Sequence, residues 1–105
     1  MAKYRWQVSY TTDGARGLLK DGGTGRRAVV EQLVKEAGGN LDAFYFAFGE
    51  DDAYVIADLP NDTTASAISL TVAAAGGARS KTIKLLMPEE IDDAQISVAY
   101  RPPGA

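Results

Sequence analysis

The chain contains neither cysteine nor histidine among its 105 residues. The absence of cysteine excludes disulfides, thiolate catalysis and zinc–sulfur sites, and the absence of histidine removes the commonest general base and metal ligand. Only oxygen donors and methionine remain as metal ligands. We therefore expect no transition-metal site, no haem and no other cofactor.

Basic charge and long apolar runs are also scarce. The net charge is −3, whereas nucleic-acid-binding domains carry a basic face, so we expect no nucleic-acid partner. No apolar stretch approaches the ~20 residues that a membrane span needs, and the first ten residues, MAKYRWQVSY, carry charge where a signal peptide is apolar. We expect a soluble, cytoplasmic protein with no membrane partner. The sequon that begins at Asn61 is interpreted as a helix cap rather than a glycosylation site.

Hydrophobic residues make up 46% of the chain, enough for one packed domain over residues 1–105. Strand patterns of period 2 or of β-forming residues occupy residues 3–10, 41–48, 53–59 and 80–87. Helical patterns occupy residues 25–37 and 62–75, with shorter pieces at 15–20 and 88–95 and an extended tail at 100–105. The first long helix ends at a glycine pair, as a left-handed cap requires.

The order strand, helix, strand, strand, helix, strand defines the fold class. Right-handed crossovers convert this order into a four-stranded antiparallel sheet with the spatial order 4-1-3-2 and both helices on one face. We therefore predict an α+β, ferredoxin-like βαββαβ sandwich.

The stretch DGGTGRR, residues 21–27, raises the question of a phosphate-binding loop. Such a loop joins a strand to a helix and directs backbone N–H groups at an anion. Here the glycine-lysine-serine/threonine and dinucleotide patterns are both absent, and the stretch follows a helical piece. We interpret it as a turn and a helix start capped by Thr24. The alternative is an anion site with Arg26 and Arg27 as its charged arms.

A two-residue turn at Glu50-Asp51 divides the strand residues between the two faces of the sheet. The wholly apolar set suits the helix side: Tyr4, Trp6, Val8, Phe44, Phe46, Phe48, Ala53, Val55, Ala57, Ile83 and Leu85. The opposite set mixes polar and apolar residues, which is typical of a partner surface or a ligand cavity. Its candidate ligand-binding residues are Arg5, Gln7, Tyr45, Tyr54, Asp58 and Lys84. The alternative is that these residues satisfy one another within a dimer interface.

Two further groups of charged residues lie near strand ends. Asp52 opens the third strand and Arg79 precedes the fourth, two strand spacings or about 10 Å apart. We predict that they share a polar cluster across Tyr10; the alternative is that Asp52 caps the hairpin and Arg79 faces solvent. Four acids, Glu89, Glu90, Asp92 and Asp93, lack calcium-loop spacing and are interpreted as a solvated helix face.

Three segments resemble the GYD-domain family: FYFAFGEDDAYVIADLP with the alanine-rich helix after it, ARSKTIKLL, and SYTTDGARGLLKDGG. The family is named for a glycine, a tyrosine and an aspartate at the hairpin, where Gly49 and Asp52 match and Asp51 stands in the tyrosine's place. Arg79 also matches. The resemblance implies a ferredoxin-like fold assembled as a dimeric α/β barrel in which two sheets face one another, and it implies no particular activity.

These observations favour a small homo-oligomer that binds a small organic molecule between its sheet and a partner copy. A second hypothesis is a cofactor-free enzyme, monooxygenase- or isomerase-like, that acts on a small aromatic or enolisable substrate with a tyrosine as acid and Lys84 as base. A third is a structural assembly or regulatory module.

Overall fold

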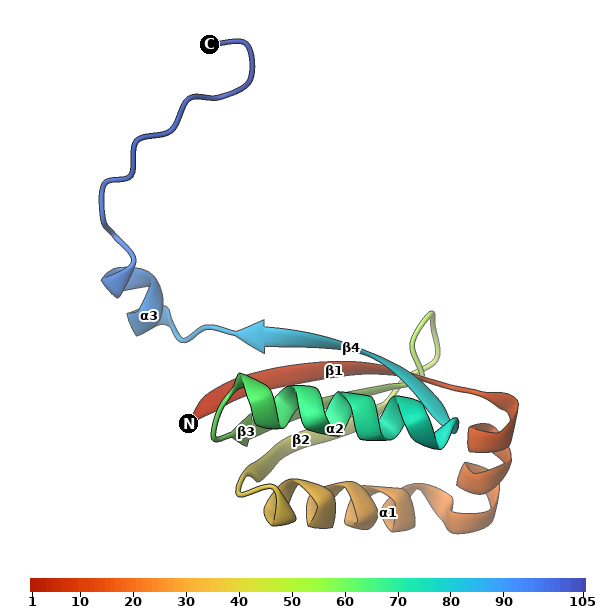
Figure 1. Cartoon of the computed structure of the whole chain (residues 1–105). Helices are drawn as coiled ribbons and strands as arrows, with labels where there is room; N and C mark the ends of the chain where they lie inside the picture. The colour runs from red at the N-terminus through yellow and green to blue at the C-terminus, as the bar shows by residue number, and fades with distance from the viewer.

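The computed structural model describes residues 1–105 as one sheet with helices on one side (Figure 1). The elements are β1 (Ala2–Tyr10), α1 (Thr12–Glu36), β2 (Asn40–Phe46), β3 (Ala53–Leu59), α2 (Asp62–Ala75), β4 (Ala78–Leu85) and α3 (Pro88–Asp93). The strands follow the order β2-β3-β1-β4, and each adjacent pair is antiparallel. The predicted ferredoxin-like arrangement is confirmed, since this is the order 4-1-3-2 seen from the opposite edge.

The β2–β3 hairpin keeps its predicted faces with a different register. Phe46 pairs with Ala53 and Phe44 with Val55, whereas a two-residue turn pairs Phe48 with Ala53. The displacement is two residues, so alternation leaves the side chains from Ala43 to Phe46 on their predicted faces. A bulge between Leu41 and Ala43 shifts the alternation and places Leu41 opposite Ala57, on the helix side. The connection is a longer loop, residues 47–52, and Phe48 is fully exposed within it rather than packed against the helices.

The predicted faces of the fourth strand are wrong. Ile83 pairs with Arg5 and Leu85 with Lys3, so both lie on the face away from the helices. Lys84 pairs with Tyr4 and lies on the helix side. The β1–β4 register begins with Ala78, which is buried opposite Tyr10, and every second residue after it lies on the helix side. Isoleucine and leucine are poor guides to the inner face here, because the outer face of this sheet is itself partly apolar.

Helix α1 is longer than predicted. It begins at Thr12 and is capped by Thr11, whose hydroxyl accepts a hydrogen bond from the Gly14 N–H at 3.2 Å. The two expected helical pieces are joined across a bend at Gly22, whose φ is 78°, a value that glycine adopts without steric cost. The prediction that Thr24 caps a separate helix is therefore wrong. In contrast, α2 has the predicted bounds.

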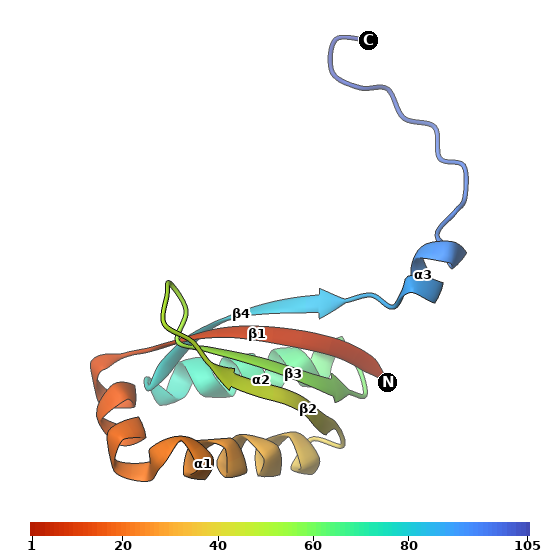
Figure 2. The same ribbon diagram turned by 180° about the vertical axis from the view of Figure 1, so that it is seen from behind.

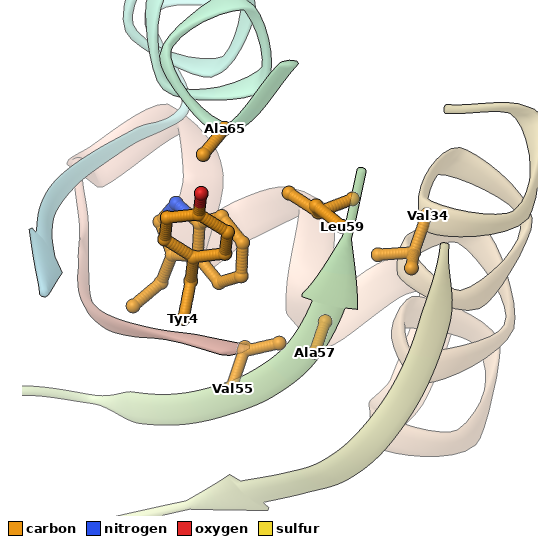
Figure 3. Packing of buried hydrophobic residues seen from close by; sticks show 7 residues of the cluster. Tyr4, Val34, Val55, Ala57, Leu59 and Ala65 are labelled. Atoms are coloured by element: carbon orange, nitrogen blue, oxygen red, sulfur yellow. The ribbon is translucent and has the colours of Figure 1, made fainter. Parts of the chain in front are cut away.

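The core lies between the sheet and the two long helices. Tyr4, Trp6, Val55, Ala57 and Leu59 project from the sheet, and they meet Val34 of α1 and Ala65 of α2 (Figure 3). The Trp6 indole N–H donates to the Ser69 hydroxyl at 3.1 Å, which satisfies its one polar atom. Only 11 of the 105 residues are buried, so the single copy leaves much apolar surface in contact with water.

The C-terminal segment leaves the body of the molecule. After β4 the chain forms the short helix α3 and then extends away from the sheet (Figures 1 and 2). The radius of gyration is 16.8 Å, compared with about 13 Å for a compact chain of ~100 residues. No helix combines the length and the apolar character that crossing a lipid bilayer requires.

The start of α1 is held against the turn between α2 and β4, and this contact needs glycine at position 14. A Cβ there would overlap the Gly77 carbonyl oxygen, to which the Thr11 N–H donates at 3.1 Å. We expect Gly14→Ala to lower the free energy of unfolding by about 1–3 kcal/mol. Gly17→Ala is the matched control, because a Cβ at Gly17 meets nothing within 4 Å.

The control should be neutral or stabilising by up to ~1 kcal/mol, since alanine favours helix. Urea unfolding of both variants measures the difference. Equal stability of the two would contradict the close approach of α1 to Gly77.

Candidate functional site

The candidate site is the face of the sheet opposite the helices, here called the outer face. The strand register assigns to it Lys3, Arg5, Gln7 and Ser9 of β1; Ala43 and Tyr45 of β2; Tyr54, Ile56 and Asp58 of β3; and Arg79, Lys81, Ile83 and Leu85 of β4. Five of the six predicted ligand-binding residues thus share one surface. Lys84 is the exception.

Arg5 occupies the centre of the outer face. Its cross-strand partners are Ile56 on one side and Ile83 on the other, and its guanidinium lies 5.8 Å from the centre of the Tyr54 ring, within range of a cation–π attraction. The Nε of Arg5 is buried and has no hydrogen-bond partner. A buried donor without an acceptor costs free energy, so this atom is a place where an additional group could bind favourably.

One end of the outer face is closed by an ion-pair cluster. Lys3 bonds to Asp42 and to Asp58, the latter at 3.0 Å. The hydrogen bond that the Lys3 ammonium donates to Asp42, followed by the one it donates to Asp58, raises the pKa of Lys3 above its usual value. Asp58 is therefore engaged with Lys3 rather than free to meet a ligand.

The opposite end carries a buried carboxylate that sequence reasoning did not select. Asp51 is only 6% exposed, and it accepts hydrogen bonds from Gln7 Nε2 at 3.0 Å and from Ser9 Oγ at 3.2 Å. These residues line a polar hollow of about 390 Å³ that also includes Arg79 and Lys81. The signal was Asp51 at the family's tyrosine position, but the short-turn assumption placed it at the tip of the hairpin.

Asp52 and Arg79, the predicted polar cluster, lie in different surroundings. The Asp52 carboxylate accepts the backbone N–H of Tyr10 at 2.8 Å, and the Asp52 N–H donates to the Val8 carbonyl at 2.8 Å. Arg79 forms no ion pair. It lies on the outer face, opposite Ser9 in the β1–β4 register. Asp52 thus bonds to the end of β1, and the aspartate that shares a hollow with Arg79 is Asp51.

Lys84 belongs to a cluster on the helix side. Its ammonium lies 3.2 Å from the carboxylate of Asp62, in the first turn of α2, and the Tyr4 hydroxyl donates to the same carboxylate. The hydrogen bond to Asp62 raises the pKa of Tyr4 to about 12. The Tyr4 and Lys84 hydrogen bonds lower the pKa of Asp62.

The glycine-rich stretch lies within α1 and therefore does not form a loop between a strand and a helix. Arg26 lies beside Tyr10 at the edge of an apolar cavity of about 60 Å³ between the sheet and the helices. Burial raises the pKa of Tyr10, and the charge of Arg26 opposes that rise. Arg27 is exposed, so the two arginines do not form paired arms.

The fold and the site define a single α+β domain with a ferredoxin-like sheet and a mixed polar and apolar outer face. No group of three or more acidic side chains is placed to hold a metal ion. The family model of the GYD domain matches residues 4–95, most of the chain. The chain belongs to the GYD domain family. Comparison with curated proteins and with solved structures gave no match.

The Tyr4–Asp62 contact predicts an unusual phenol titration. In the native protein the Tyr4 phenol should ionise near pH 12 rather than near 10. An unfolded chain ionises this phenol at lower pH, so the stability that the contact contributes is complete below pH ~10 and is lost as the pH rises toward 12.

Ultraviolet difference titration of the native protein and of Asp62→Asn measures this pKa. The Asn variant should ionise Tyr4 at a lower pH, with Tyr4→Phe identifying the phenol concerned. Identical titration curves for the native protein and Asp62→Asn would contradict the contact.

Proposed function

We propose that the protein is a homo-oligomer built from dimers, in which the outer faces of two sheets pack together and enclose a site for a small organic molecule. The composition of the outer face carries this proposal. Its middle holds Ile56, Ile83 and the ring of Tyr54, all partly buried, around the single charged side chain of Arg5, while its other charged residues lie toward the two ends. An apolar centre with a polar rim is the usual anatomy of a specific interface.

The limited burial of the single copy supports the same assembly. With 11 residues buried, the chain has a small core for its length. A sheet-to-sheet contact would cover apolar area on both copies, at about 25 cal/mol per Å². A stable interface of this kind buries about 1,600 Å² in total.

The polar groups of the outer face define the chemistry of the proposed ligand. Arg5 offers an unpartnered donor beside an aromatic ring. The hollow at one end is lined by two bases, Arg79 and Lys81, and by two acids, Glu50 and Asp51. Gln7 is held in place by Asp51. This combination suits a small molecule with an apolar or aromatic body and an anionic group or hydrogen-bond acceptor.

The enzyme hypothesis loses its proposed base, because Lys84 lies on the other face and is paired with Asp62.

The cytoplasmic location remains part of the proposal. The interpretation of the sequon as a helix cap is supported separately, because the Asn61 side chain caps α2 and accepts the Thr64 N–H at 2.9 Å.

The oligomer is tested by placing a charge at the centre of the outer face. Ile56→Lys adds a positive charge beside Arg5 of the same copy and, across the interface, near the lysine that the same substitution introduces in the second copy. We expect the dimer dissociation constant to rise at least ~100-fold, because an unpaired buried charge costs about 3–5 kcal/mol.

The control is Val29→Lys on α1, where the native side chain is already exposed, and it should leave the dimer unchanged. Light scattering over a concentration series measures the molecular mass of both variants. A native protein that stays an 11.1 kDa monomer at high micromolar concentration would refute the assembly.

Ligand binding is tested with simple aromatic acids. We expect benzoate and 4-hydroxybenzoate to raise the melting temperature of the native protein and benzyl alcohol to raise it less, because Arg5 favours an anion. Arg5→Gln should lower the apparent affinity for these acids at least ~10-fold, and with it the rise in melting temperature, because a charge-assisted hydrogen bond is lost.

Lys20→Gln removes the same charge from an exposed site on α1 and should leave the affinity unchanged. If the dimer forms but no acid binds in an Arg5-dependent manner, the third hypothesis, an assembly module, replaces the ligand-binding proposal.

A further inference from the structure

The C-terminal segment after β4, residues 86–105 and here called the arm, has the pattern of a segment that packs on a surface. Within it Ile96, Val98 and Tyr100 alternate with smaller or polar residues, so in an extended chain they share one side. They are 73%, 74% and 77% exposed. Three large apolar side chains in register on a segment without contacts indicate a missing partner.

A second exposed apolar group lies at the other end of the sheet. Phe48, in the β2–β3 loop, is 110% exposed. With Phe46 it lines a largely apolar hollow of about 430 Å³ between the loop and the start of α1, to which α1 contributes Ala15, Leu18 and Gly23. The loop lies where β1 ends and β3 and β4 begin, whereas the arm leaves from the end of β4. Figures 1 and 2 show the loop and the arm rising from opposite ends of the sheet, both on the side away from the helices.

The charges at these two ends are complementary. Helix α3, at the base of the arm, carries four acids, Glu89, Glu90, Asp92 and Asp93, none of which forms an ion pair. Arg79 and Lys81 lie on the outer face at the loop end, exposed and outside any ion pair, in a hollow that Glu50 and Asp51 also line. A contact between opposite ends of two copies would therefore bring unpaired acids to unpaired bases.

We propose that the arm of each copy packs on the β2–β3 loop of a second copy of this chain, with α3 beside the second copy's basic pair and the Ile96–Val98–Tyr100 row against its Phe48 hollow. This rests on the proposed pairing of outer faces. A two-fold axis that lies between the sheets and perpendicular to the strands brings the arm end of one copy to the loop end of the other. The contact is then made twice, as an isologous dimer requires.

The dimensions allow this contact. Facing sheets lie about 10 Å apart, and the 12 residues that follow α3 can extend up to about 40 Å. The arm already projects into the space on the outer side of its own sheet, where the second copy would lie (Figure 1). The arm can therefore reach the second copy without any strand unfolding.

The chain has no cysteine, so an introduced thiol pair reports the contact directly. Full-length Val98→Cys protein is mixed with full-length Phe48→Cys protein and oxidised. We expect a disulfide-linked heterodimer on a non-reducing gel. The control mixture pairs Val98→Cys with Leu70→Cys, another exposed site, on the solvent side of α2, and should give at most about one-tenth of that product.

Two outcomes would overturn the proposal. Equal cross-linking to position 70 would indicate random collision. A chain carrying both Val98→Cys and Phe48→Cys that links only to itself would show that the arm folds back over its own sheet.

A second measurement separates this contact from the pairing of the sheets. The double variant Ile96→Asp, Val98→Asp should weaken the dimer at least ~10-fold, whereas Ser97→Asp, Ala99→Asp, on the opposite side of the arm, should change it less than ~2-fold. A native dimer that Ile56→Lys disrupts, but that neither arm variant affects, would sustain the sheet pairing and refute the role of the arm. A monomeric native protein would refute both.

Discussion

The structure depends on one constraint: a single antiparallel sheet can be covered by its own helices on one side only. Alternation along each strand sends every second side chain to the uncovered face. On the inner side, Trp6 and Tyr4 pack among small residues of β3 and α2, and their polar atoms bond to Ser69 and Asp62. On the outer side, no element of the same chain is available for this purpose, so the polar groups there must satisfy one another or meet a partner.

The outer face meets this constraint differently along its length. At one end Lys3 is neutralised by two aspartates, and at the other Asp51 is held by Gln7 and Ser9. Between them, Arg5 lies among apolar neighbours with an unpartnered Nε. The Lys3 end is locally complete, whereas the centre holds an unpartnered donor and the loop end holds two bases, Arg79 and Lys81, outside any ion pair. The proposed interface and the proposed ligand are therefore both assigned to the centre.

The loop between β2 and β3 connects this face to the rest of the molecule. Its two adjacent aspartates have separate roles, because successive side chains point in different directions. Asp52 bonds to the backbone of Tyr10 and fixes the loop to the end of β1, while Asp51 turns to the outer face. The same loop leaves Phe48 fully exposed beside the start of α1, so one short segment lines the polar hollow with Asp51 and the apolar hollow with Phe48.

The sequence by itself determined the element types, their order, the bounds of β3 and α2, and the family, because these follow from local periodicity, caps and glycine positions. It also determined the faces of β1 and β3, where aromatic and small residues alternate with polar ones. Tertiary structure decided the face of Lys84, the length of the β2–β3 loop and the surroundings of Asp51 and Asp52. The face of Lys84 depends on the register between β1 and β4, which are distant in sequence, and a one-residue difference there moves a side chain to the opposite face. The loop and its two aspartates depend on hydrogen bonds to β1, which is equally distant in sequence.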